Sequence, residues 1–227
     1  MKNINFILLV FLPVWIKSQG PVFSGGYGYF KTGYANIDNI TINRYLNSNG
    51  IPSISKNGYV IGGGGMGVIN NFIIGGEGGA FAANSSAGAL GMAELSAGYG
   101  MFNFGYMLPL KSSFSVYLLF GMGWGGSGLK LKYSSGSEME FGSSASFIKG
   151  EINADWFMHG NAEKYEKAGL LTGISVGYML QPLSESWKNK NGAYVDVPAM
   201  FMNGFYVKLK IGGGGIGLSG KAGKKEN

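Results

Sequence analysis

The sequence predicts an all-β protein: an antiparallel up-and-down barrel of about eight strands that crosses a membrane. Two segments, Phe147–Met158 and Ala168–Gln181, carry the prediction because their side chains alternate most regularly. In the first segment one face holds Ile148, Ile152, Ala154, Trp156 and Met158. The opposite face holds Lys149, Glu151, Asn153 and Asp155. A period of two with one apolar and one charged face fits a strand between lipid and a polar interior.

Turn and loop residues divide the rest of the chain into strands of similar kind. We expect strands at Phe23–Ile37, Gly58–Ile69, Phe72–Ala83, Met92–Leu108, Ser113–Tyr133, Phe147–Met158, Ala168–Gln181 and Asn203–Leu218. In the fourth strand the apolar side chains change parity halfway, which predicts a β-bulge near Gly98–Gly100. Asn70 and Asn71 form a two-residue hairpin turn, because asparagine tolerates positive φ.

The connections alternate between long and short. The long connections are Asp38–Asn57, Ser134–Ser144 and Pro182–Met200, and the remaining connections between strands are shorter. Of the shorter links, the one before the seventh strand includes 161–164, where a single helical turn is expected. Outer-membrane barrels have an even number of strands, long external loops and short periplasmic turns. An N-terminus delivered by a signal peptide places the long loops outside, so the predicted topology is self-consistent.

Composition supports the same class. Only 13% of residues are charged, 14% are aromatic and 42 are glycine, against a usual glycine content of about 7%. Residues 1–19 have the charge, apolar run and small-residue end of a secretory signal. We expect residues 20–218 to form the barrel and residues 219–227 to form a polar tail. The chain has no cysteine, which excludes disulfides and thiolate metal sites.

The export signal, the eight strands and the loop asymmetry resemble the small outer-membrane β-barrels of Gram-negative bacteria over essentially the whole mature chain. The resemblance lies in the pattern and in no diagnostic motif. It implies location in the cell outer membrane and contact with membrane lipid.

Two other architectures also use alternating strands. A soluble ligand-binding barrel points its apolar face inward and carries charge outside, whereas here the apolar face is large and aromatic. A glycine-rich fibre would show an internal repeat, and none is visible beyond shared glycine runs.

Charged residues on the predicted inward faces form the first candidate site. They are Glu77, Glu94, Lys149, Glu151, Asp155, Lys208 and Lys210. The interior of an eight-stranded barrel is just wide enough for side chains to fill it, and buried charges must pair. We therefore expect a structural network of ion pairs; an ion path is the alternative.

Glycine runs form the second candidate site, because strands eight, one, two and three are neighbours in a closed barrel. The patch comprises Gly62, Gly63, Gly64, Gly65, Gly75, Gly76, Gly212, Gly213, Gly214 and Gly215. Glycine relieves crowding where a small barrel bends sharply. The alternative interpretation is a thin wall against which a lipid or a partner packs closely.

Function is less constrained than fold. The single histidine, His159, falls at a predicted periplasmic turn, so we expect no enzyme, no metal site and no cofactor. The net charge of +6 comes partly from the signal and tail and does not indicate a nucleic-acid partner. The expected role is structural or surface-interacting, with an extracellular or periplasmic protein as a candidate partner. The long loops supply residue types common at binding hot spots, namely Arg44, Tyr45, Trp187 and Tyr194. Small-molecule or lipid transport is the alternative.

Overall fold

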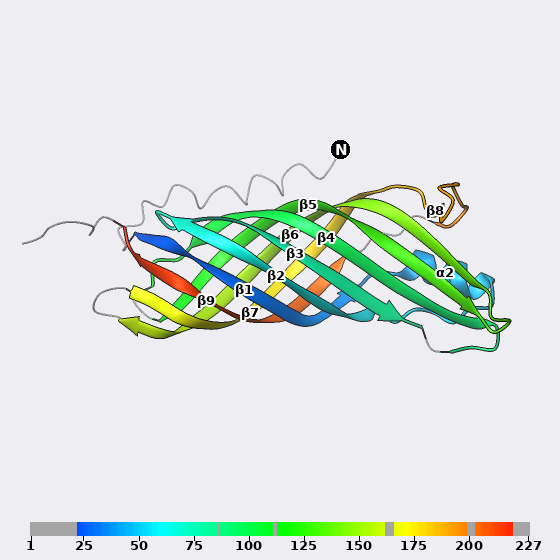
Figure 1. Cartoon of the computed structure of the whole chain (residues 1–227), viewed down its shortest axis with the longest axis horizontal. Coiled ribbons are helices and arrows are strands. Elements are labelled where there is room, and N and C mark those ends of the chain that lie inside the picture. The colour runs from blue at the N-terminus through cyan, green and yellow to red at the C-terminus, as the bar shows by residue number, and fades with distance from the viewer. Residues whose placement is uncertain (1–21, 86, 111–112, 162–165, 199–202, 220–227) are drawn as a thin grey trace, which may run out of the picture.

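Eight long antiparallel strands form a closed barrel in the computed structural model, which describes residues 22–85, 87–110, 113–161, 166–198 and 203–219 (Figure 1). The strands are β1 (Phe23–Ile37), β2 (Asn57–Ile69), β3 (Phe72–Asn84), β4 (Gly91–Met107), β5 (Phe114–Tyr133), β6 (Glu138–Asn161), β7 (Glu166–Ser184) and β9 (Gly204–Leu218). Sequential strands pair from β1 to β7, and β9 pairs with both β7 and β1, which closes the barrel. The predicted fold class is confirmed.

Two short elements lie at one end of the barrel: helix α2 (Ile40–Ser48) and the two-residue strand β8 (Lys188–Asn189), which pairs with β6 (Figure 1). We call this end the cap end. The opposite end carries the β2–β3 hairpin turn, in which Asn70 and Asn71 have φ of 53° and 68° as the sequence predicts. We call it the turn end. The Asn71 side chain accepts a hydrogen bond from the backbone N–H of Phe23 over 2.6 Å, which ties β1 to this turn.

Inward and outward positions alternate as predicted. In β6, Ile148, Ile152 and Trp156 are 46%, 58% and 43% exposed, whereas Lys149 and Glu151 are buried. The outward positions of β1, β2, β3 and β9 carry no charged side chain in the described ranges. On the other strands, outward charges occur only near strand ends, at Glu94, Lys130, Lys132, Glu138, Glu140 and Glu166. We call the charge-free outer band the membrane belt.

Aromatic pairs mark both edges of the membrane belt. Tyr34 and Tyr59 lie with ring centroids 4.8 Å apart near the cap end, and Tyr178 and Phe205 lie 4.6 Å apart at a similar level. Near the turn end, the Phe72–Tyr106 centroids are 5.4 Å apart and the Phe114–Trp156 centroids 6.4 Å apart. Two aromatic girdles flanking an apolar band are the exterior of a membrane-spanning barrel, not of a soluble one. No described helix is both long and apolar enough to span a bilayer.

Three details of the predicted strands are wrong. First, β4 pairs with β3 and β5 in unbroken register, so there is no bulge near Gly98–Gly100. Leu95 and Met101 are both inward residues of the apolar cap-end core, so the parity never changes along β4. The register shifts lie instead between β6 and β7, at Ser146/Ile148 and Phe157/His159.

Second, most of Ser134–Ser144 is strand, because β5 and β6 continue beyond the barrel as a long hairpin closed at 134–137. Paired charges stabilise this extension: the Lys130 ammonium lies 2.7 Å from the Glu138 carboxylate and 3.4 Å from that of Glu140. Third, the strand preceding the last long loop runs to Ser184, so that connection begins later than predicted. Three predicted segments lie outside the described residues. They are the signal (1–19), the single helical turn (161–164, except Asn161, which ends β6) and the tail (219–227, except Ser219).

Helix α2 was not predicted, since the connection 38–56 contains many Asn and Ser residues. Its Ile42 and Leu46, one helical turn apart, are both 0% exposed and pack into the cap-end core. The Asn43 amide donates to the Ile54 carbonyl oxygen over 2.9 Å, while its oxygen accepts from the Ile54 N–H over 2.8 Å. The helix is therefore fixed to the returning chain and covers the mouth of the barrel.

Candidate functional site

The middle of the barrel contains a buried ring of ion pairs formed by Lys31, Glu77, Lys149 and Glu151. The Lys31 ammonium lies 3.1 Å from the Glu77 carboxylate and 2.8 Å from that of Glu151. The Lys149 ammonium lies 2.7 Å and 3.4 Å from the same two carboxylates. Every side chain in this ion-pair ring is at most 2% exposed. Each cation thus contacts both anions, which is the pairing that buried charge requires.

Tyrosine hydroxyls complete the ring. Tyr29 donates to Glu77 over 3.2 Å, and Tyr206 donates to Glu151 over 2.9 Å. Lys208 lies next to the ring without an ion pair among the described residues; it donates to the Tyr99 hydroxyl over 3.1 Å. Its ammonium also lies 4.1 Å from the centroid of the Tyr206 ring. A cavity of about 20 Å³ beside Lys208 and Tyr99 has room for about one water molecule.

A second charged group lies nearer the turn end. Lys210 pairs with Asp155 and also donates to the Tyr117 hydroxyl over 2.7 Å and to the Asn153 side-chain oxygen over 2.9 Å. The Tyr117 hydroxyl donates to Asp155 over 2.6 Å. Both charged groups lie between two apolar layers, one at each end of the barrel.

The structure brings six of the seven predicted lumen charges into the interior and leaves one out. Glu94 is an outward residue near the cap end, where its carboxylate lies 2.5 Å from the Lys132 ammonium, and both side chains are about one-third exposed. Its expected inward position was wrong because strand β4 keeps one parity throughout. Sequence reasoning missed Lys31, whose signal is its parity: it shares the inward face of β1 with Tyr27 and Tyr29.

The predicted glycine patch divides into two faces. Gly62, Gly64, Gly75, Gly212 and Gly214 occupy inward positions, and Gly63, Gly65, Gly76, Gly213 and Gly215 occupy outward ones. A Cβ built on Gly62 would lie 2.5 Å from the Gly78 carbonyl oxygen, and one on Gly64 would strike the carbonyl oxygen of Gly76. A Cβ on Gly65 would have its nearest neighbour at an ordinary 3.7 Å. Close backbone approach therefore requires the inward glycines, whereas most outward ones have room for a side chain.

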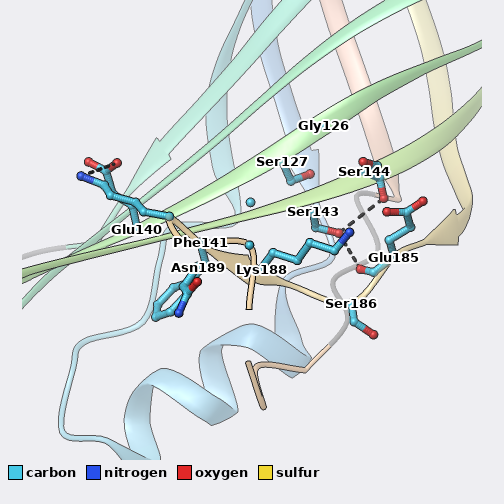
Figure 2. Close-up of a pocket in the computed structure, with 13 residues that line it drawn as sticks. Gly126, Ser127, Glu140, Phe141, Ser143, Ser144, Glu185, Ser186, Lys188 and Asn189 are labelled. Atoms are coloured by element: carbon cyan, nitrogen blue, oxygen red, sulfur yellow. Dashed lines mark hydrogen bonds and ion pairs between the residues drawn. The ribbon is translucent and has the colours of Figure 1, made fainter. Parts of the chain in front are cut away.

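The cap end carries an open pocket of about 610 Å³ between the β5–β6 extension and the β8 region. We call it the cap pocket. Its lining residues are Gly126, Ser127, Glu140, Phe141, Gly142, Ser143, Ser144, Glu185, Ser186, Lys188, Asn189, Lys190 and Gly192. Figure 2 shows Ser143, Ser144, Glu185 and Lys188 gathered at one end of it, with Glu140 at the other.

Backbone and side-chain contacts fix the walls of the cap pocket. The Ser143 hydroxyl donates to the Glu185 carbonyl oxygen over 2.6 Å, and the Glu185 N–H donates to the Ser144 carbonyl oxygen over 2.9 Å. Lys190 lies 3.2 Å from Glu140. The hydrogen bonds from Lys190 and Lys130 hold the pKa of Glu140 below its usual range. The carboxylate therefore remains charged, and in contact with β5 and the β8 region, at neutral pH.

The predicted hot-spot residues divide between core and surface. Trp187 is 0% exposed, and its indole N–H donates to the Pro198 carbonyl oxygen over 2.9 Å, so it anchors the cap and cannot contact a partner. Tyr194 is 71% exposed, and the Lys188 ammonium lies 5.0 Å from its ring centroid. Arg44 is exposed on α2, and Tyr45 packs partly against the core. His159 is exposed in β6 near the turn end, far along the strand from the cap pocket.

No family model matches the chain, and no curated protein matches it. Among solved structures, the barrel is similar to Neisserial surface protein A, with a TM-score of 0.40 and 10% identity over 87% of this chain and 97% of that one. Ail of Yersinia pestis, in complex with the heparin analogue sucrose octasulfate, has a TM-score of 0.39 and 14% identity over 88% and 98%. The outer membrane protein OprG of Pseudomonas aeruginosa gives 0.40 and 12% over 87% and 96%. The strand pairing and membrane belt of the chain itself define it as an eight-stranded β-barrel of the outer-membrane type.

Proposed function

We propose that this protein is a surface-interaction barrel of the outer membrane that acts through its cap end and neither conducts solutes nor catalyses a reaction. The observation that carries the proposal is the contrast between interior and cap. The interior is filled with ion pairs and apolar layers, and α2 covers its mouth. The cap, by comparison, presents a wide polar pocket with fixed walls.

Orientation follows from the general rule for such barrels. Short turns face the periplasm and longer connections face outward, and the long connection 38–56 and the described part of the connection between β7 and β9, residues 185–198, both lie at the cap end (Figure 1). The cap pocket would then face the exterior of the cell, where a protein or another surface molecule can reach it.

The absence of cysteine from the sequence makes orientation directly testable. We expect Tyr194→Cys to react with a membrane-impermeant maleimide on intact cells, because its side chain is exposed at the cap. Asn70→Cys, at the turn end, should react only after the outer membrane is permeabilised. Labelling in the reverse order would overturn the proposal.

A second measurement separates interaction from transport. Planar-bilayer recordings of the purified protein should show no stable channel steps, because the ion-pair ring and both apolar layers fill the barrel. A reproducible open state would replace the proposal with transport.

A further inference from the structure

We infer that the cap pocket binds an uncharged, hydroxyl-rich chain, which in chemical class is a neutral saccharide. This inference rests on the proposed function and specifies the ligand class for the same site. It is carried by exposed polar groups that have no protein partner among the described residues, by the balanced charge and by the glycines in the wall of the pocket.

The first step is the inventory of groups available to a ligand. The hydroxyls of Ser144 and Ser186 and the carboxylate of Glu185 make no hydrogen bond or ion pair within the described residues. The Lys188 ammonium makes no ion pair there either and lies only over the Tyr194 ring. The lining of the pocket therefore includes two hydroxyls, one acceptor and one donor. Saccharide hydroxyls both donate and accept, so they can satisfy all four groups.

The second step is charge. Glu140 and Glu185 offset Lys188 and Lys190 in the lining of the pocket, and Glu140 and Lys190 already pair with each other. A polyanionic ligand would gain no net attraction from such a wall and would approach two carboxylates. Electrostatic complementarity thus favours a neutral ligand over a sulfated or phosphorylated one.

The third step is shape. The volume of about 610 Å³ lies within the usual range for small-ligand sites, roughly 300–1,000 Å³. Gly126 of β5 and Gly142 of β6 lie at outward positions on two paired strands in the wall of the pocket. Both leave backbone accessible because they have no side chain. Because the walls are already fixed, less conformational entropy of the protein is lost when a ligand binds.

The test uses a side chain that fills the pocket without straining the barrel. A Cβ built on Gly142 meets nothing within 4 Å, so Gly142→Tyr can occupy the pocket from a regular strand position. Gly150→Tyr is the matched control, because it lies on the same outward face of β6, also has nothing within 4 Å, and is outside the pocket. Heat-modifiable gel mobility should show that both variants fold.

Purified full-length protein in detergent would be titrated with short neutral oligosaccharides of defined composition, with a sulfated oligosaccharide and with an extended peptide of similar length. We expect a neutral oligosaccharide to bind, Gly142→Tyr to lower its affinity at least tenfold, and Gly150→Tyr to leave it unchanged. Ser144→Ala should weaken binding roughly 2- to 10-fold, the usual effect of one lost hydrogen bond. Ser96→Ala, an outward serine on β4 that does not line the pocket, should have no effect.

The outcomes separate this inference from the proposed function. Binding of only the sulfated ligand or only the peptide, lost in Gly142→Tyr, would overturn the saccharide class and leave the surface role intact. No binding of any neutral oligosaccharide, or equal loss in both tyrosine variants, would also overturn it. Failure of the proposed function appears elsewhere, as inverted cysteine labelling or a conducting channel.

Discussion

Replacing Glu151 by leucine should destabilise the barrel more than truncation of a lipid-facing side chain on the opposite face of the same strand. Glu151 accepts from Lys31 at 2.8 Å and from Tyr206 at 2.9 Å, and its other contact is Lys149 at 3.4 Å. In Glu151→Leu, Lys31 and Lys149 would share Glu77 as their only carboxylate in the ion-pair ring. Removal of one partner from a buried ion pair costs about 3–5 kcal/mol.

The comparison variant is Ile152→Ala, the next residue along β6, whose side chain is 58% exposed to the membrane. It loses three carbons from a surface that lipid covers in the folded state. At about 0.8 kcal/mol for each fully buried methylene, the expected loss is roughly 1–2 kcal/mol. The two variants should therefore differ by about 1–4 kcal/mol.

Urea titrations of both variants in detergent or phospholipid vesicles, followed by heat-modifiable gel mobility, measure this difference. The double variant Lys31→Met/Glu151→Leu is the internal control, because removing both partners of a buried pair is often close to neutral. It should recover part of the loss. Greater destabilisation by Ile152→Ala than by Glu151→Leu would refute the assigned faces, and no recovery in the double variant would refute the pairing.

Three further predictions concern the glycines and the cap. Gly64→Ala should destabilise by about 1–3 kcal/mol through its backbone clash, whereas Gly65→Ala should be neutral or stabilising by up to about 1 kcal/mol, both measured by the same titration. Ile42→Asp should expose the cap to limited proteolysis and Ile40→Asp should not, since Ile42 is 0% exposed and Ile40 52%. Because the folded pKa of Glu140 is lowered, its contribution is present above the usual glutamate pKa of about 4.3 and is lost only as the pH falls through the lower folded value. Hydrogen-exchange protection of 138–140 should thus be constant from neutral pH down to about 5, and Glu140→Gln should lower it.

The strands could be predicted because lipid and a packed interior impose opposite chemistry on alternate residues. This is clearest in β6 and β7, where charge or small polar groups alternate with large apolar ones. The rule fails where both faces are apolar, which is why β4 suggested a bulge near Gly98. It also missed Lys31, because a single lysine among the Tyr and Gly residues of β1 gives little pattern of its own.

Elements at the cap were harder to predict because tertiary contacts decide them. Helix α2 has only nine residues, and its stability comes from burial of Ile42 and Leu46, not from its Asn-containing sequence. The β5–β6 extension did have a signal, since Lys130 pairs in register with Glu140 and Lys132 with Glu138. Complementary charges at facing positions can identify such a hairpin when turn residues suggest a loop.

The distribution of charge shows where chemistry can occur on this barrel. Inside, the carboxylates and most of the lysines form ion pairs that hold strands together, and the buried Lys208 and Lys167, which have no ion pair among the described residues, donate hydrogen bonds instead. Within the membrane belt, lipid excludes charge from the outer face. At the cap end, solvent permits polar groups to remain without protein partners, and among the described residues Glu185, Ser144 and Ser186 do so in the lining of one pocket. Recognition is therefore expected at the cap pocket, and the barrel below it serves as a rigid support.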